Sequence, residues 1–248
     1  MSRVALVTGV GRRGGIGAAI VRGLLDDGWD VCLTWWGEYD ERQPWGRDAD
    51  TVPDLEIHAS AAGRTVRAME ADLSDPSAPA RVLQEFTPVS ALICAHCECQ
   101  PSSTDDTTEA SFDLHYAVNV RATWLLIREF GRQFPHGTAG RIVTLTSDHV
   151  VGNLPYGATK AAADRVTLAA AHDLGHLGIT ANVVNPGPVD TGWMNDDHRA
   201  HAASMTPLNR AATADDPADL VRFLCSGSGG WITGQLMKSN GGFTSSIS

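Results

Sequence analysis

The sequence has no long hydrophobic run and a deficit of positive charge, and both features narrow the classes of protein to which it can belong. No apolar stretch approaches the roughly 20 residues that a membrane-spanning helix needs. The formal net charge is −10, which disfavours nucleic acid or an anionic membrane as a partner. Residues 1–7 run directly into a strand-like pattern and lack the hydrophobic region of a signal peptide. We therefore expect a cytoplasmic protein that binds neither membranes nor nucleic acids.

Cysteine is scarce, and its pattern provides neither a disulfide framework nor a metal site. The five cysteines are odd in number and lie mostly in apolar runs, so reduced thiols are the simplest interpretation. Three cysteines and one histidine lie close together within residues 94–99, which suggests zinc at first sight. That spacing is too tight for a usual zinc site, and a second pair of ligands is not evident, so we predict no metal.

The chain also lacks a composition break, an internal repeat and a low-complexity segment, so residues 1–248 are interpreted as one domain. Apolar, β-branched runs alternate with helix-like segments, which is typical of a parallel sheet covered on both faces. We predict a single-domain, doubly wound α/β Rossmann fold with a seven-stranded parallel sheet. The expected strands are residues 4–8, 30–34, 65–70, 89–94, 141–147, 179–185 and 231–238.

A glycine-rich turn follows the first predicted strand and opens the first predicted helix. In a strand–turn–helix context, glycines let the backbone approach a pyrophosphate, and the free N–H groups of the helix N-terminus bind it. A tight turn without a ligand is the alternative. The residues that we expect to bind a dinucleotide here are Gly9, Gly11, Gly15, Ile16 and Gly17.

The end of the second predicted strand has no acidic residue, and this absence bears on the cofactor. An acid there would accept a hydrogen bond from the adenosine ribose and repel a 2′-phosphate. The sequence has Thr34 followed by two tryptophans, and its first acid is Glu38. Arg12 and Arg13 in the glycine-rich turn could instead pair with a 2′-phosphate, unless both are simply solvated. We therefore predict NADP(H) as the cofactor.

Tyr156 and Lys160 are four residues apart on a predicted helix, so their side chains share one face. A nearby ammonium favours the phenolate and lowers the pKa of a tyrosine, which then can exchange a proton with a carbonyl or alcohol oxygen. Ser147 ends the fifth predicted strand, at the edge where ligands bind in open parallel sheets. Asn119 lies within a long predicted helix, where asparagine is a mediocre residue; it has either a tertiary role or only a buried hydrogen bond.

Together these residues resemble the classical short-chain dehydrogenases/reductases over essentially the whole chain, with the 3-oxoacyl-carrier-protein reductases as the nearest subgroup. The resemblance implies that Tyr156 is the proton donor, that Ser147 hydrogen-bonds the substrate carbonyl and that Asn119 holds a relay water. It implies that Lys160 lowers the pKa of Tyr156 and holds the nicotinamide ribose, so that both residues also contact the cofactor. Further cofactor contacts implied by the resemblance are Thr34, Asp72, Leu73, Ala95, Pro186, Gly187, Val189 and Thr191. For Asp72 an N-terminal capping role is the alternative.

The sequence departs from the family pattern in three places. The glycine-rich turn is longer than usual, which changes the contacts of Arg12 and Arg13. Residues 94–97, Cys-Ala-His-Cys, replace the usual Asn-Asn-Ala-Gly, so we carry over only a backbone role there. The loop between Ser147 and Tyr156 is shorter than usual, which suggests an open substrate cleft or one closed by another segment.

The resemblance implies an NADPH-dependent reductase that transfers hydride to a ketone such as a 3-oxoacyl thioester. The alternatives are an NADP(H)-binding protein without catalysis, acting as a sensor or a partner subunit, and an epimerase or dehydratase. Residues 192–214 are expected to form a substrate lid, and Trp193, Met194 and Met205 within it suit an apolar or extended substrate. A homo-oligomer, either a tetramer or a dimer, is also implied.

Overall fold

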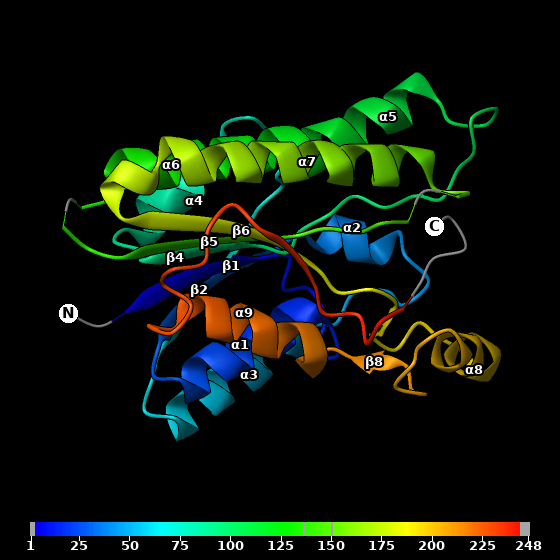
Figure 1. Ribbon diagram of the computed structural model, residues 1–248, viewed down its shortest axis with the longest axis horizontal. Coiled ribbons are helices and arrows are strands. Elements are labelled where there is room, and N and C mark those ends of the chain that lie inside the picture. The colour runs from blue at the N-terminus through cyan, green and yellow to red at the C-terminus, as the bar shows by residue number, and fades with distance from the viewer. Residues whose placement is uncertain (1–2, 136, 150, 244–248) are drawn as a thin grey trace.

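A computed structural model describes residues 3–135, 137–149 and 151–243, and its centre is a seven-stranded parallel sheet (Figure 1). The strand order is β3-β2-β1-β4-β5-β6-β9. This arrangement confirms the predicted doubly wound α/β fold. The strands are β1 (Val4–Thr8), β2 (Asp30–Trp35), β3 (Val66–Glu70), β4 (Ala91–Cys94), β5 (Gly140–Leu145), β6 (Ile179–Asn185) and β9 (Leu236–Lys238).

Helices cover both faces of the sheet, which is why its central strands are apolar throughout. Both β4 and β5 are buried along their whole length. The two layers of helices enclose two separate hydrophobic clusters, one on each face. One face carries α4 (Ala78–Phe86), α5 (Glu109–His115), α6 (Thr123–Gln133) and α7 (Leu154–Asp173); the other carries α1 (Ile16–Asp26), α3 (Thr51–Ala61) and α9 (Asp215–Cys225) (Figure 1).

The order of the strands reverses at β1, because the chain passes from β1 to β2 and β3 on one side and then to β4 on the other. In open α/β sheets, the crevice outside the carboxyl ends of the strands at such a switch point is where ligands bind. Three segments meet there: the turn after β1, the chain after β2 and the chain after β4. The short strands β7 (Val189–Asp190) and β8 (Ala212–Thr213) and helix α8 (Asp196–Ser204) also lie toward this end (Figure 1).

Several element boundaries differ from the sequence-based expectations. A short helix, α2 (Gly37–Glu41), directly follows β2, where polar residues and glycines do not predict one. The long helix after Thr108 is interrupted by a π-helical segment, η1 (Tyr116–Ala122), which contains Asn119. Strand β5 ends at Leu145, so Ser147 lies beyond the strand rather than at its last position. Propensity and periodicity do not encode these details, because they depend on packing and on hydrogen bonds that are made across the fold.

None of the described helices is both long and apolar enough to cross a membrane. The expected lid, residues 192–214, contains α8, whose N-terminal cap is Asn195. Arg199 anchors this helix by pairing with Asp190 at 2.7 Å and with Asp196 at 2.7 Å. The lid therefore has an ion-paired attachment to the chain that leaves β6.

Candidate active site

The glycine-rich turn after β1 has two positions that only glycine can occupy. Gly9 has a φ of +77°, and a Cβ on it would lie 2.6 Å from the backbone of His96. A Cβ on Gly17 would lie 2.8 Å from the carbonyl oxygen of Gly9. Helix α1 follows Gly15, and no side chain of the described residues caps it. Its first N–H groups and the positive end of its dipole are thus available to an anion, as a bound pyrophosphate requires.

The structure separates the two arginines of this turn. Arg12 reaches across the crevice, donates to the carbonyl and the hydroxyl of Thr191 at 3.2 and 3.0 Å, and lies 4.1 Å from the ring centre of Trp45. Arg13 instead lies on the outer side of the turn, half exposed, and pairs with Asp48 at 3.1 Å. Arg12 is therefore the turn's cation inside the crevice, and it already links the turn to the chain after β6.

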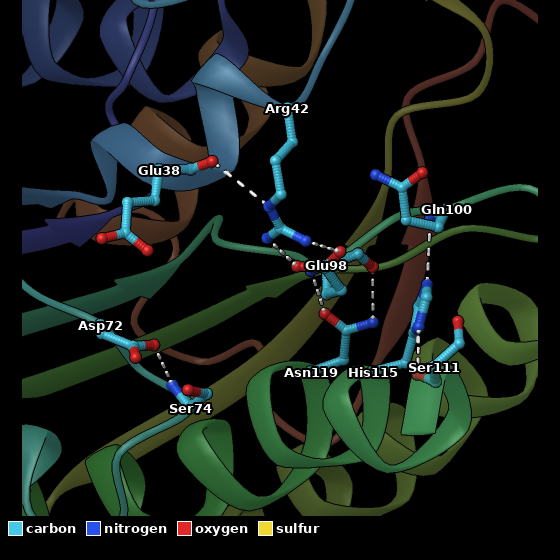
Figure 2. A network of polar contacts seen from close by, with 9 residues as sticks. All are labelled: Glu38, Arg42, Asp72, Ser74, Glu98, Gln100, Ser111, His115 and Asn119. Atoms are coloured by element: carbon cyan, nitrogen blue, oxygen red, sulfur yellow. Dashed lines mark hydrogen bonds and ion pairs between the residues drawn. The ribbon is translucent and has the colours of Figure 1, made fainter. Parts of the chain in front are cut away.

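The other residues that were expected to contact the adenosine half of the cofactor differ in burial and in their hydrogen-bond partners. Thr34 is only 1% exposed, and its carbonyl accepts the N–H of Val10. Asp72 accepts the N–H of Ser74 at 2.8 Å in a local turn (Figure 2), but it does not cap the next helix, because α4 begins at Ala78 with Ser77 as its N-cap. Leu73 is buried and Ala95 is half-buried, with its backbone close to Gly9.

The turn after β6 is fixed by contacts of its backbone. Gly187 has a φ of +66° and donates its N–H to the side chain of Asn185 at 3.0 Å. A Cβ on Gly187 would lie 2.5 Å from the Cβ of Asn240, so these segments pack closely. The preceding Pro186 is buried. The carbonyl of Val189 accepts the indole N–H of Trp193 at 3.0 Å, which ties the expected lid to this turn.

Lys160 is buried beside Tyr156, with its Nζ atom 5.8 Å from the centre of the phenol ring. The ammonium donates to the carbonyls of Leu145 at 2.9 Å and His96 at 3.3 Å, which are the ends of β5 and the continuation of β4. Two carbonyls thus fix the charge at the edge of the sheet. The predicted placement of the two side chains on one helix face is what the structure shows.

Burial raises the pKa of the Tyr156 phenol well above its ordinary value, and a hydrogen bond with Ser147 acts in the opposite direction. Desolvation is the larger effect because it disfavours the charged form of a buried phenol. A lowering of this pKa by Lys160 stays an implication of the family resemblance. Val150, in the short loop between Ser147 and Tyr156, lies outside the described residues.

The side-chain amide of Asn119 is used entirely for contacts with the chain after β4 and with α7. Its side chain accepts the N–H of Glu98 at 2.8 Å and donates to the carbonyl of Glu98 at 3.0 Å, as Figure 2 shows. It also donates to the hydroxyl of Thr159 at 2.9 Å. Its own carbonyl accepts the hydroxyl of Thr123. The buried, hydrogen-bonded amide that was one of the two alternatives is therefore present, and it fixes the chain after β4.

Glu98 was not singled out from the sequence, although it is even more deeply buried than Lys160. Its side chain is 3% exposed and pairs with Arg42 at 3.0 Å (Figure 2). Arg42 follows α2, so the ion pair joins the chain after β2 to the chain after β4. The only sequence signal was an acidic residue just beyond an apolar strand.

His96 also has more than the backbone role that was carried over. Its Nδ1 atom lies 2.6 Å from the hydroxyl of Thr8, and its Nε2 atom donates to the carbonyl of Val118 at 3.1 Å. Burial, together with the charge of Lys160, lowers the pKa of His96 to about 3. One neutral imidazole thus ties β1, the end of β4 and the π-helical segment together. Among the described residues, no group of three or more potential ligands could hold a metal ion.

We predict that His96 makes the stability of the protein fall with acid. Its folded pKa lies below the ordinary value of about 6.5, so the unfolded chain binds more protons below that pH and the folded state is disfavoured. The unfolding free energy of the unmodified protein falls between pH 7 and pH 5, and His96 accounts for about 2 kcal/mol of that fall. In His96→Asn the fall should therefore be smaller by about 2 kcal/mol. Urea unfolding at both pH values measures this, with the exposed His172→Asn as control. An unchanged pH dependence in His96→Asn would contradict a buried neutral imidazole.

Comparison with known proteins shows to which family this chain belongs. The family model described as enoyl-(acyl carrier protein) reductase matches residues 9–244. The uncharacterized oxidoreductase YjdA of Bacillus subtilis (strain 168) is 35% identical over 97% of this chain and 96% of its own. The acetoacetyl-CoA reductase of Allochromatium vinosum is 28% identical over 98% of each chain.

A solved structure is similar over nearly the same length. A blue fluorescent protein from a metagenomic library, in complex with NADPH, matches with a TM-score of 0.85 and 30% identity over 98% of both chains. The family match spans the glycine-rich turn, the Ser147–Tyr156–Lys160 group and the turn after β6. The chain therefore belongs to the enoyl-(acyl carrier protein) reductase family of short-chain dehydrogenases/reductases, which are oxidoreductases.

Proposed function

We propose that the protein is a cytoplasmic NADP(H)-dependent reductase that acts on a ketone, of which a 3-oxoacyl thioester is the leading candidate. The observation that carries this proposal is the placement of the Tyr156 phenol beside Ser147 and the buried Lys160 at the edge of the crevice. A reductase needs such a proton donor beside a dinucleotide site, whereas a protein that only binds the cofactor does not.

The crevice fits a dinucleotide by its own geometry. Gly9 and Gly17 let the turn pack tightly against the chain after β4 and against itself, and α1 offers uncapped N–H groups. Arg12 supplies a positive charge beside the turn, and Arg13 is the second cation that a 2′-phosphate could pair with, in exchange for its contact with Asp48. The NADPH in the similar solved structure supports the same choice of cofactor. When bound, the nicotinamide supplies the hydride.

The side chains of this protein handle the proton and the developing charge. The hydroxyl of Ser147 donates a hydrogen bond to the substrate oxygen and stabilises negative charge that develops there. Tyr156 gives its proton to that oxygen. Lys160, fixed by the carbonyls of Leu145 and His96, provides a positive charge that favours the resulting phenolate and holds the ribose. The backbone near Asn119 holds the water that returns the proton.

The lid favours an apolar or extended substrate. Trp193 is half exposed while its indole N–H is held by Val189, so its ring presents an apolar surface. Met194 is buried and Met205 is half-buried. The acetoacetyl-CoA reductase among the relatives acts on a thioester of this class by its name, which supports a 3-oxoacyl thioester here.

We also propose a homo-oligomer, a tetramer or a dimer. Trp231 is 98% exposed, and Phe223 and Leu236 nearby in the sequence are each more than 40% exposed. Large exposed apolar side chains at one end of a chain are typical of an interface. Sedimentation equilibrium should show a multiple of the monomer mass that falls in Trp231→Ser, and a monomer at all concentrations would contradict the proposal.

We predict that Tyr156→Phe abolishes turnover without removing cofactor binding. Loss of a positioned acid typically costs about 10²–10⁴ in rate. The assay is NADPH oxidation across 3-oxoacyl thioesters, β-keto esters and cyclic ketones, with NADPH binding followed by fluorescence. Tyr116→Phe, an exposed tyrosine on the π-helical segment, is the matched control and should keep its rate. Turnover that survives in Tyr156→Phe would show that another group supplies the proton.

We predict that the two arginines of the glycine-rich turn act differently. Arg12→Gln should weaken both NADPH and NADH by about tenfold, or about 1.4 kcal/mol, because its guanidinium lies inside the crevice. Arg13→Gln should weaken only NADPH, because a 2′-phosphate is the one group that an outer arginine can distinguish. Fluorescence titration of both nucleotides measures this. The separation is wrong if Arg12→Gln leaves both dissociation constants unchanged.

A further inference from the structure

The ion pair between Arg42 and Glu98 crosses the crevice in which the proposed function places the dinucleotide. Arg42 follows α2 on the β2 side, and Glu98 follows β4 on the other side of β1. The two guanidinium nitrogens Nη1 and Nη2 lie 3.4 and 3.0 Å from the two carboxylate oxygens (Figure 2). Such a two-point contact fixes both the position and the plane of the guanidinium.

Glu98 itself is rigidly held. Asn119 bonds both its N–H and its carbonyl, and the carboxylate is 3% exposed, whereas Arg42 is 44% exposed. Opening the pair would leave a buried carboxylate without a counter-charge, which is strongly unfavourable. The pair therefore stays closed when a ligand binds, and Glu98 acts as a fixed support for Arg42.

Arg42 retains hydrogen-bonding capacity. A guanidinium has five N–H groups. Three of those on Arg42 are used, one by the carbonyl of Glu38 and two by Glu98. Among the described residues, the other two N–H groups have no hydrogen-bond acceptor, and the side chain is nearly half exposed. A guanidinium matches the geometry of a phosphate as well as that of a carboxylate.

The surroundings of Arg42 place these groups at the dinucleotide crevice. Arg42 lies 5.7 Å from the ring centre of Tyr39 on α2, and the hydroxyl of Tyr39 shares a hydrogen bond with the thiol of Cys97 after β4. Tyr39 and Cys97 are both close enough to Arg12 to act on the pKa of its guanidinium. The chain after β2, the glycine-rich turn and the chain after β4 therefore converge on one place.

We propose that Glu98 is a positioning residue for the cofactor, which holds Arg42 across the crevice so that the two remaining N–H groups bind a phosphate of the dinucleotide. This inference rests on the proposed function. The shared chemistry is a phosphate oxygen, whose source is either the 2′-phosphate of the adenosine or the pyrophosphate. The carboxylate orients the donor, and the arginine makes the contact.

The test is the dissociation constant of NADPH, measured by fluorescence in the full chain and in three variants. Glu98→Gln keeps the size of the side chain and the backbone bonds to Asn119 but removes the charge, and it should weaken NADPH about tenfold. Arg42→Gln should weaken it by at least as much, and the double variant should lose no more than Arg42→Gln alone. Glu85→Gln removes an exposed ion pair with Arg67 on the far side of β3 and is the matched control.

Competition with adenosine 2′,5′-bisphosphate and with ADP identifies the phosphate. A loss confined to the bisphosphate assigns the contact to the 2′-phosphate, and a loss shared with ADP assigns it to the pyrophosphate; a purely structural role would not distinguish the two. Arg42 is half exposed, so Arg42→Gln remains informative if Glu98→Gln does not fold. If the unmodified chain binds NADPH and both variants bind it equally well, this inference is wrong. If the unmodified chain does not bind NADPH, the proposed function fails as well.

Discussion

The buried ammonium of Lys160 is the interaction on which the rest of the site depends. It is one of only two lysines in the chain, and it is 4% exposed. A charge in such a place needs hydrogen-bond acceptors, and it finds the carbonyls of Leu145 and His96 where β5 and β4 end. Those two strands therefore have to be in register and α7 has to lie across them, so the charge and the sheet fix one another.

The neighbouring polar groups follow the same constraint. Both ring nitrogens of His96 make hydrogen bonds, one with Thr8 on β1 and one with the π-helical segment. The side-chain amide of Asn119 bonds to Glu98 and Thr159. These side chains bond to several different elements, so hydrogen bonds as well as apolar packing hold this end of the sheet together. Glu98 and Arg42 extend the polar framework from the chain after β4 to the chain after β2.

The fold and the Tyr156–Lys160 pair could be predicted because local periodicity encodes them: apolar strands, a glycine turn and a four-residue spacing on a helix. The role of Asn119 was predicted only as a pair of alternatives. Arg12 against Thr191, His96 against Thr8 and Arg42 against Glu98 could not be predicted, because each contact joins residues that are distant in sequence and depends on how the strand ends meet. The burial that raises the pKa of Tyr156 could not be predicted either, since burial is a property of the folded chain.

The central claim is that this crevice carries out hydride transfer to a carbonyl carbon. The most direct measurement is a reaction with NADPH that carries deuterium at C4 of the nicotinamide, followed by mass spectrometry of the product from a 3-oxoacyl thioester. The account predicts one deuterium on the carbon that bears the new hydroxyl group. Product that carries no deuterium after incubation with either C4 isotopomer, or bound NADPH that is never oxidised, would contradict it.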